Sequence, residues 1–362
     1  MRVLAALSGG VDSSVMAALL LDEGHEVVGA TMKLWGGESD SGCCSVSDVE
    51  DARRSAAQLG IDHHVFNFSD EFDEYVVNPY VASYANGRTP NPCIECNRRL
   101  KFDVLLRRAD MLGFDAVATG HHARVHVMAD GSKRIARGHD SKKDQSYVLY
   151  PVTSSDLERV LLPIGEMTKD RVRSMAAELG LRTAPKPDSQ DVCFITKSDG
   201  REAFLAARTE LHQARVVDSD GVVVGAVDAI EMVTIGQRRG LNLAGGSEPR
   251  FVTDVDVSTS TVTIGTRRDL MTDVLVLDQI VWAAEAVTGQ VMVQCSAHGT
   301  AEAALITDAA GPSDGSVTLR WMEPHRRVAP GQSVVMYQLV GGRELGEPPA
   351  ATEVVVGGGI AR

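Results

Sequence analysis

A glycine- and serine-rich turn near the amino terminus constrains the fold of this chain most strongly. The segment SGGVDSS (8–14) lies between the apolar run RVLAAL (2–7) and a helix-like stretch over residues 13–22. A strand, a glycine-rich turn and a helix amino terminus together form an anion site, because backbone N–H groups point outward and the helix dipole favours negative charge. Gly9 and Gly10 let the backbone approach that anion closely. The turn therefore predicts a phosphate site at the start of an α/β domain.

Strand-like and helix-like patterns alternate through about the first 200 residues. The strand-like runs HEVVGATM, DHHVFNF and FDAVATG are separated by helix-like segments. One of these segments opens with a capping box at Ser47 and Glu50, and another has apolar residues at helical spacing and ends at Gly113. The alternation predicts a parallel sheet with helices on both faces and a ligand at the carboxyl ends of the strands.

The pattern changes to short β runs after about residue 205. The segment ARVVDSDGVVVGAV indicates a hairpin around an Asp-Gly turn, and further β runs continue to the carboxyl terminus. We therefore predict an α/β catalytic domain over residues 1–205, a small β-rich central domain over residues 206–275 and a β-barrel over residues 276–362.

Composition excludes several classes of protein. The 362 residues are too many for one ordinary core, and no apolar run is long enough to span a membrane. The net charge of -13 implies no global attraction to nucleic acid, although basic residues cluster in 97–108 and 133–143. Each cluster is either a local binding patch or ordinary solvated surface. The apolar stretch MRVLAAL is too short for a secretory signal, and six cysteines in a chain of this length do not indicate a disulfide framework. We therefore expect a cytoplasmic protein.

Two cysteines lie in chemically suggestive surroundings. Cys96 directly precedes Asn97, which we predict to be a helix N-cap, and Arg98 and Arg99 follow it. A thiol beside a helix amino terminus and two guanidinium groups should have a lowered pKa. The CxxC spacing could instead be half of a zinc site, although no second CxxC completes one. Cys193 follows a polar loop that contains prolines.

The motifs resemble those of a known family over nearly the full length. SGGVDSS is similar to the pyrophosphate-binding loop (PP-loop) of ATP pyrophosphatases, which split ATP between its α and β phosphates. Together with TMKLW, GRTPNPC, CNRRLKF, ATGHHAR, KDQSYVLY, DSQDVCFI, TIGQRRGL, PGQSVVMY and the terminal GGGI, it resembles the bacterial tRNA-specific 2-thiouridylases. The resemblance implies a parallel-sheet adenine-nucleotide domain, a β-rich central domain and a carboxyl-terminal β-barrel, with ATP and Mg²⁺ as cofactors.

The resemblance also implies a reaction. The family thiolates C2 of the wobble uridine, U34, in tRNAs for lysine, glutamate and glutamine. Adenylation turns the C2 oxygen into a good leaving group, and sulfur from a persulfide on Cys193 then replaces AMP. Cys96 would be the nucleophile that releases this sulfur, and an alternate Cys96–Cys193 disulfide would then need reduction. The implied partners are tRNA and a persulfide-donor protein or a cysteine desulfurase.

Site residues follow from the same resemblance. ATP would contact Ala6, Leu7, Ser8, Gly9, Gly10, Val11, Asp12, Ser13, Met32 and Gly120. Asp12 would help to hold the magnesium ion. Target base and tRNA would contact Asn91, Pro92, Cys93, Lys143, Asp144 and Gln145. Met32 could instead be a core residue at a strand end, and Gln145 could simply cap the following helix.

The chain departs from the family at two places. Many relatives have aspartate, a suggested catalytic base, where this chain has Cys93, so that role does not transfer. An Arg-Tyr pair that touches tRNA in relatives matches Gln294 and Cys295 here, and we do not carry that site over. Cys43 and Cys44 receive no role, and Cys295 is expected to be structural.

Three other interpretations remain open at this point. Cys93, Cys96 and Cys193 could hold a [4Fe–4S] cluster with one open position, as an alternative sulfur route. A PP-loop synthetase with a small substrate would explain SGGVDSS but not these cysteines. A non-catalytic RNA-binding protein on the same scaffold is the third possibility.

Overall fold

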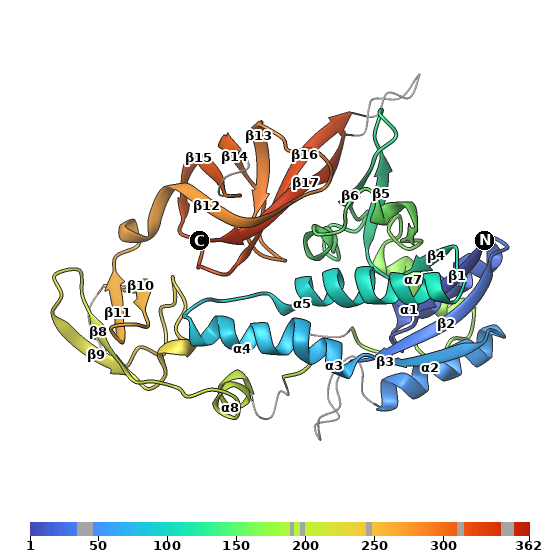
Figure 1. Cartoon of the computed structure of the whole chain (residues 1–362), viewed down its shortest axis with the longest axis horizontal. Coiled ribbons are helices and arrows are strands. Elements are labelled where there is room, and N and C mark those ends of the chain that lie inside the picture. Colours follow the sequence, from blue (N-terminus) through green and yellow to red (C-terminus); the bar gives the residue numbers. More distant parts are fainter. Residues whose placement is uncertain (35–45, 189–191, 196–199, 244–247, 310–314, 342–350) are drawn as a thin grey trace.

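A computed structural model describes residues 1–34, 46–188, 192–195, 200–243, 248–309, 315–341 and 351–362. Cys43 and Cys44 lie outside these described residues. Figure 1 shows an α/β part that contains the amino terminus, a small β-rich part at the opposite end of the long axis and a barrel above them. None of the helices in the described ranges is long and apolar enough to cross a membrane.

The amino-terminal part is built on a five-stranded parallel sheet with the strand order β3-β2-β1-β4-β7. The strands are β1 (Arg2–Ala6), β2 (Glu26–Lys33), β3 (His63–Asn67), β4 (Ala116–Ala118) and β7 (Val160–Leu161). Alternate side chains of β1 enter different cores, since Leu4 packs on one face while Val3 and Ala5 pack on the other. Because β1 is buried on both faces, its sequence is a continuous apolar run. Burial on both faces confirms the predicted parallel sheet with helices on both sides.

Two groups of helices cover the sheet. The core that contains Val3 and Ala5 also takes side chains from α1 (Val11–Asp22), α2 (Val46–Leu59) and α7 (Lys169–Glu178). The core that contains Leu4 takes side chains from segments on the opposite face, which include α3 (Ser69–Phe72), η1 (Asp73–Val77), α4 (Asn78–Ala85), α5 (Pro92–Glu95), η2 (Cys96–Val104) and α6 (Leu105–Met111). The remaining short helices are η3 (Ser146–Leu149), η4 (Asp156–Glu158), α8 (Gly200–Ala206), η5 (Ile230–Met232) and η6 (Arg268–Leu270).

Helix boundaries agree with the sequence pattern at their carboxyl ends. Gly60 and Gly113 follow α2 and α6 with φ values of +71° and +73°, a left-handed conformation that favours glycine. The amino terminus of α2 differs, because a cap at Ser47 would make Asp48 the first helical residue, whereas the helix already includes Val46 and Ser47.

The helix that carries Cys96 begins earlier than we predicted. Helical residues run without a break from Pro92 through α5, η2 and α6, so Asn97 is not an N-cap. The cap is Asn91, whose side chain accepts a hydrogen bond of 3.1 Å from the backbone N–H of Cys93. Asn91 supplies the acceptor, and proline at the first helical position needs no partner for an N–H group. The helix amino terminus therefore lies beside Cys93, and Cys96 lies inside the helix at the start of its π-helical stretch.

A four-stranded sheet with the order β10-β11-β8-β9 forms the central part. Its strands are β8 (Ala214–Val217), β9 (Val223–Val227), β10 (Phe251–Asp256) and β11 (Thr261–Gly265). The predicted hairpin is present, because β8 and β9 pair antiparallel and Asp218 Oδ1 accepts hydrogen bonds from the N–H groups of Asp220 and Val222 in the turn.

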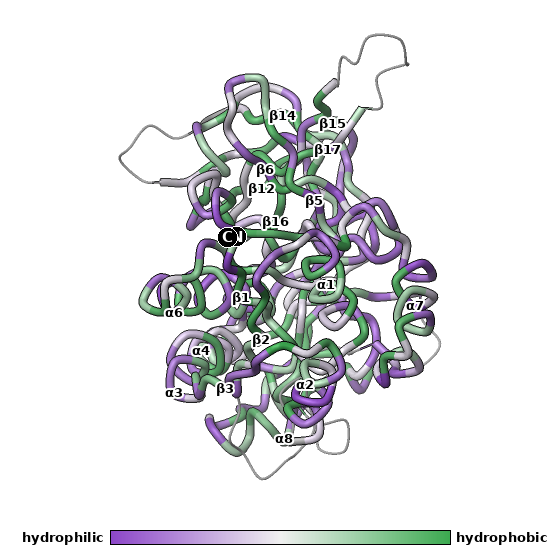
Figure 2. The backbone as a smooth tube through the Cα atoms, turned by 90° about the vertical axis from the view of Figure 1, so that its right-hand side faces the viewer, coloured by the Kyte–Doolittle hydropathy of each residue, from purple (hydrophilic) through white to green (hydrophobic). Residues whose placement is uncertain are grey.

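The carboxyl-terminal part is a closed antiparallel barrel with the order β12-β15-β14-β13-β16-β17, closed by pairing of β12 with β17. Its strands are β12 (Met271–Trp282), β13 (Gly289–Gln294), β14 (Glu302–Ala309), β15 (Val317–Arg326), β16 (Ser333–Gly341) and β17 (Ala351–Ala361). Figure 2 shows β16 as a largely hydrophobic strand through the interior. The barrel confirms the predicted fold class.

A hairpin from the first half of the chain extends the barrel sheet. Strands β5 (Ala123–Val127) and β6 (Lys133–Arg137) pair with each other, and Ala136 pairs with Val354 of β17. The barrel is thereby attached through this hairpin to the loop that follows β4 (Figure 1).

Candidate ATP and thiol site

The predicted ATP loop runs from the end of β1 into the first turn of α1. Gly9 has a φ of +71°, and Gly10 is the N-cap of α1 without any side-chain cap. Ser13 Oγ accepts a hydrogen bond of 3.2 Å from the backbone N–H of Ser8 and donates one of 3.1 Å to the carbonyl oxygen of Gly10. The loop is therefore braced by its own serines while the helix amino terminus has no side-chain acceptor, which suits an anion.

Gly120, the other predicted contact on the phosphate side, packs directly on this loop. A Cβ atom at Gly120 would lie 2.7 Å from the backbone nitrogen of Ser13 and 2.8 Å from the carbonyl carbon of Asp12. Only glycine fits there without a shift of the backbone. Met32 lies near the end of β2, two residues beyond Ala30, which pairs with Ala6 at the end of β1. The structure thus brings these predicted ATP residues to the carboxyl edge of the sheet.

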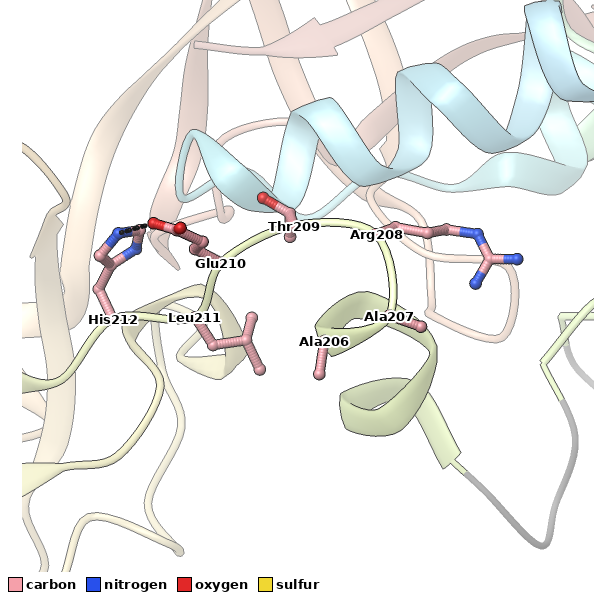
Figure 3. Close-up of a pocket in the computed structure, with 7 residues that line it drawn as sticks. All are labelled: Ala206, Ala207, Arg208, Thr209, Glu210, Leu211 and His212. Carbon is pink, nitrogen blue, oxygen red and sulfur yellow. Dashed lines mark ion pairs between the residues drawn. The ribbon is translucent and has the colours of Figure 1, made fainter.

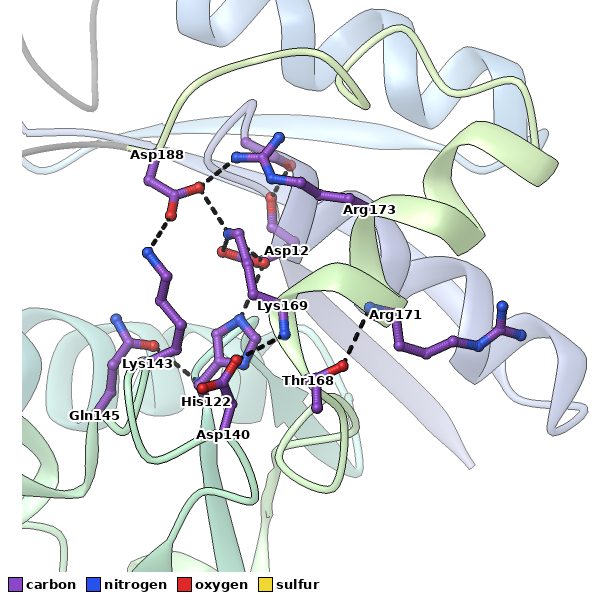
Figure 4. A network of polar contacts seen from close by, with 12 residues as sticks. Asp12, His122, Asp140, Lys143, Gln145, Thr168, Lys169, Arg171, Arg173 and Asp188 are labelled. Atoms are coloured by element: carbon purple, nitrogen blue, oxygen red, sulfur yellow. Dashed lines mark hydrogen bonds and ion pairs between the residues drawn. The ribbon is translucent and has the colours of Figure 1, made fainter.

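Asp12 is the centre of a polar cluster (Figure 4). Lys169 Nζ donates to Oδ1 at 2.8 Å and to Oδ2 at 2.7 Å, and His122 Nε2 lies 3.1 Å from Oδ1. Burial alone would raise the pKa of Asp12, but the hydrogen bonds from His122 and Lys169 outweigh it and lower the pKa. The carboxylate is therefore kept ionised at neutral pH.

Asp188 extends the cluster toward the predicted tRNA triplet. It accepts from Lys169 at 2.8 Å, from Lys143 at 2.7 Å and from Arg173 at 2.7 Å. Burial opposes ionisation, but hydrogen bonds from Lys143 and Lys169 hold the pKa of Asp188 well below its usual range. A continuous chain of ion pairs therefore joins Asp12 of the ATP loop to Lys143.

The other two residues of the triplet are engaged inside the protein. Asp144 is 8% exposed and accepts a hydrogen bond of 2.9 Å from Arg137. Gln145 Oε1 accepts one of 2.8 Å from the backbone N–H of His122, and its side chain makes no cap hydrogen bond to η3. Lys143 is the most exposed of the three, at 42%. Lys143 is therefore partly exposed while it pairs with Asp188, and Asp144 and Gln145 hold the loop in place.

The thiol side lies on the helical layer that begins at Pro92. Cys93 is exposed, Cys96 is buried and Cys193 is partly buried. Cys96 and Cys193 pack into the same hydrophobic core. Phe194 anchors the segment of Cys193 by edge contacts with Phe72 and Tyr80, with ring centroids 5.6 and 5.3 Å apart. Folding thereby brings a remote cysteine segment onto the layer of Cys96.

A buried histidine connects this helical layer to the ATP side. His121 directly follows Gly120, its Nδ1 lies 2.7 Å from Thr119 Oγ1, and its Nε2 lies 3.3 Å from Nζ of Lys101 on η2. Burial, together with the positive charge of Lys101, lowers the pKa of His121 well below its usual value. The ring is therefore neutral and accepts from Lys101.

The barrel residues Gln294 and Cys295 are turned toward the protein. Gln294 is 3% exposed and donates to the carbonyl oxygens of Ser296 and Ala297. Burial raises the pKa of the Cys295 thiol to about 12, which fits the expected structural role. Among the residues that the structure describes, which include Cys93, Cys96 and Cys193, no group of three or more His, Cys, Asp or Glu could hold a metal ion.

Sequence reasoning missed the basic residues that surround the loop. Lys169 and Arg173 lie on α7, and Lys186 donates to the carbonyl oxygen of Gly9 at 3.0 Å and to Asp48 at 2.7 Å. The only local signal for Lys169 was Thr168, a helix N-cap that fixes the next residue at the amino terminus of α7. A shallow surface hollow lined by residues 206–212 contains none of the predicted site residues (Figure 3).

Comparison with known proteins identifies the family. The tRNA methyl transferase HUP domain model matches residues 1–197, and the tRNA methyl transferase PRC-barrel domain model matches residues 202–266. A 4-thiouridine synthetase crystallised with RNA and ATP is 20% identical, with a TM-score of 0.37 over 53% of this chain and 44% of that chain. A similarity of that size carries no argument about function.

Curated relatives match much more closely. The tRNA-specific 2-thiouridylase MnmA of Mycobacteroides abscessus is 45% identical over 349 residues, which cover 93% of this chain and 95% of that protein. The MnmA protein of Rhodococcus erythropolis is 46% identical over 353 residues, 93% of each chain. That of Herpetosiphon aurantiacus is 42% identical over 347 residues, 93% of this chain and 95% of that protein. The chain therefore belongs to the tRNA-specific 2-thiouridylase MnmA family.

Proposed function

We propose that this protein uses ATP to replace the C2 oxygen of the wobble uridine, U34, by sulfur in tRNAs for lysine, glutamate and glutamine. The observation that carries the proposal is the combination of a braced anion loop with two cysteines in one core, in a chain that aligns with 2-thiouridylases over 93% of its length. The matching domain models are described as methyl transferases, whereas the curated relatives quoted above are named for thiolation.

ATP is the cosubstrate that fits the loop. The uncapped amino terminus of α1 and the close packing of Gly120 favour a phosphate chain over a larger or neutral group. The ionised carboxylate of Asp12 is a hard oxygen ligand of the kind that Mg²⁺ prefers. Bound magnesium would neutralise phosphate charge as AMP is transferred to the uridine oxygen.

Sulfur transfer then uses the two cysteines of the shared core. Cys193, the more exposed of the pair, would receive sulfane sulfur from a persulfide-donor protein or a cysteine desulfurase. The thiolate of Cys96 attacks Sγ of Cys193, the S–S bond of the persulfide breaks, and hydrosulfide leaves. Hydrosulfide attacks C2 and AMP departs with the oxygen. The two cysteines are left as a disulfide, and a dithiol reductant restores both thiols.

The iron–sulfur route differs from this scheme in the role of Cys93. Cys93 is exposed at the amino terminus of its helix, whereas Cys96 is buried. We expect Cys93→Ser to keep most activity and anaerobically purified protein to be colourless. A brown protein with stoichiometric iron that loses activity on Cys93→Ser would replace the persulfide scheme while leaving the tRNA substrate unchanged.

Pyrophosphate release tests the proposal against its rivals. Unmodified tRNA with uridine at position 34 should stimulate release, and small carboxylic acids should not. A small-molecule synthetase would show the opposite preference, and a non-catalytic RNA-binding protein would release no pyrophosphate with either. Asp12→Ala should abolish release while the circular dichroism spectrum is retained, because the loop loses its carboxylate. An Asp12→Ala variant with the wild-type rate would remove this loop from the reaction.

Docking of tRNA to an acidic chain must use local basic patches. The candidates are Arg98, Arg99, Arg107, Arg108, Lys142 and Lys143. Two of them are partly neutralised, since Arg107 lies 2.9 Å from Asp103 and Lys143 lies 2.7 Å from Asp188. Binding should weaken as salt rises, with a slope of about -0.7 to -0.9 for each phosphate contact. A flat salt response would mean that these residues are ordinary solvated surface.

A further inference from the structure

Lys169 is an unusual lysine for its position. In the described part of the chain it is the only lysine or arginine that is buried, with 6% of its surface exposed. Burial of an ammonium group is costly unless the charge is paired and hydrogen-bonded. Its Nζ meets both conditions, since it donates to both carboxylate oxygens of Asp12 and to Asp188.

The main chain holds this lysine in place independently of its side chain. Thr168 caps α7 by accepting a hydrogen bond of 3.2 Å from the N–H of Arg171, and the N–H of Lys169 donates to Asp140 at 3.0 Å. Val172 and Ala176 of the same helix are fully buried in the core beneath α1. The backbone is thus fixed beside the ATP loop, while four methylene groups leave the ammonium group able to change partners.

The charges around Lys169 show how the cluster is balanced in the nucleotide-free protein. Three cationic side chains, Lys169, Lys143 and Arg173, surround two carboxylates, Asp12 and Asp188. Asp140, which accepts a hydrogen bond from the backbone N–H of Lys169, brings the sum of these side-chain charges to zero, and the amino terminus of α1 adds partial positive charge. Within the described residues the buried Nδ1 of His122, whose other nitrogen contacts Asp12, also has no hydrogen-bond partner. The side-chain charges are therefore balanced without nucleotide, and the uncapped amino terminus of α1 remains to attract an anion to the loop.

We propose that Lys169 is a substrate-binding residue that exchanges partners, holding Asp12 in the nucleotide-free protein and turning to the β and γ phosphates of ATP when nucleotide binds. The exchange leaves the oxygens of Asp12 to a divalent cation, for which the ammonium group would otherwise compete. Lys169 thereby keeps the carboxylate ionised and compensated until ATP arrives. This inference rests on the proposed use of ATP.

The alternative is a purely structural ion pair between α7 and the loop. A structural pair and a partner exchange both predict lower stability when Lys169 is removed. They differ in nucleotide selectivity, because only a direct contact with the β and γ phosphates distinguishes ATP from AMP. The test therefore compares the two nucleotides on the same folded variant.

The experiment is calorimetric titration of Lys169→Met with ATP and with AMP in the presence of Mg²⁺. ATP affinity should fall about 10- to 100-fold, the equivalent of one charge-assisted hydrogen bond, while AMP affinity changes by less than about threefold. The matched control is Lys133→Met on β6, which removes an ion pair of 3.0 Å with Glu158 of η4 and should leave ATP affinity unchanged. Equal losses for ATP and AMP, or no loss for either, would overturn the inference.

A second variant tests the inference in case Lys169→Met does not fold. Lys169→Met combined with Asp188→Asn removes one negative charge together with the positive one, and Asp12 keeps its contact with His122. The same selective loss of ATP affinity is expected, and wild-type affinity for both nucleotides would refute the exchange. If the wild-type protein itself binds no ATP, the proposed function fails. If it binds ATP and the variants bind equally well, only the role of Lys169 fails.

Discussion

Removal of Arg137 should loosen the barrel from the loop that carries the predicted tRNA triplet. Arg137 donates to Glu353 at 2.6 Å, to Asp144 at 2.9 Å and to Gln294 at 2.7 Å, and its guanidinium carbon lies 3.8 Å from the ring centroid of Tyr337. One side chain on β6 therefore contacts β13, β16, β17 and the triplet. Arg137→Met keeps much of the apolar stem and deletes all of these polar contacts.

The loss of unfolding free energy in Arg137→Met depends on how deeply each partner of Arg137 is buried. Asp144 is 8% exposed, so it would be left as a buried uncompensated charge, which costs about 3–5 kcal/mol. Glu353 is 31% exposed and recovers part of its solvation, so its contribution is at most about 1 kcal/mol. The contact with Tyr337 adds about 0.5–2 kcal/mol. Hydrogen bonds from Gly138 and Ser146 to Asp144 persist and offset part of the loss, so we expect about 3–5 kcal/mol in total.

The assay is urea unfolding followed by fluorescence of the barrel tryptophans Trp282 and Trp321. The matched control is Arg134→Met on the same strand, since Arg134 donates to the carbonyl oxygen of its neighbour Lys133. The control should change the free energy of unfolding by less than about 0.5 kcal/mol. If the free energy of unfolding of Arg137→Met also differs from that of the wild-type protein by less than about 0.5 kcal/mol, Arg137 does not hold the barrel to the loop.

Three further predictions concern the site and the central domain. Cys96→Ser and Cys193→Ser should each lose nearly all thiolation while tRNA-stimulated adenylation persists, measured by product mass and pyrophosphate release. Gly120→Ala should weaken ATP binding in calorimetry, because its Cβ would lie 2.7 Å from a loop nitrogen. The hydrogen bond to Glu231 raises the pKa of His212. The stabilisation that protonated His212 gives the fold should be complete below about pH 6.5 and lost as the pH rises past the raised pKa. The melting temperature of His212→Gln should therefore lack this dependence on pH.

Local sequence signals were sufficient for strands β1 to β4 of the parallel sheet and for the strand–turn–helix geometry of the glycine-rich loop, whereas the short strand β7 and the hairpin β5–β6 were not predicted. Buried parallel strands appear in the sequence as continuous apolar runs, and the positive-φ glycines Gly60 and Gly113 end α2 and α6 as predicted. The cysteine helix shows how such a signal is misread: Asn97 has the chemistry of a cap, but the pair Asn91-Pro92 supplies both an acceptor and a proline at the first position. The pair Asn91-Pro92, which comes first in the chain, therefore determines where the helix begins.

Contacts between distant segments could not be predicted from the sequence. Lys169 and Asp12 are 157 positions apart, and nothing local to either residue indicates the other. The same holds for Ala136 and Val354, whose pairing attaches the hairpin of the first half to the barrel. The resemblance supplied the predicted site residues, whereas the charges that pair with Asp12 appeared only in three dimensions.

The central claim is that this chain replaces the C2 oxygen of U34 by sulfur at the expense of ATP. The most direct measurement is nucleoside mass analysis of unmodified glutamate tRNA after incubation with the protein, ATP, Mg²⁺ and a persulfide donor. We predict 2-thiouridine at position 34 in the complete reaction, and none when ATP is omitted or Cys193→Ser replaces the wild-type protein. Thiolation without ATP, thiolation at another position, or methylated uridine as the product would contradict the account.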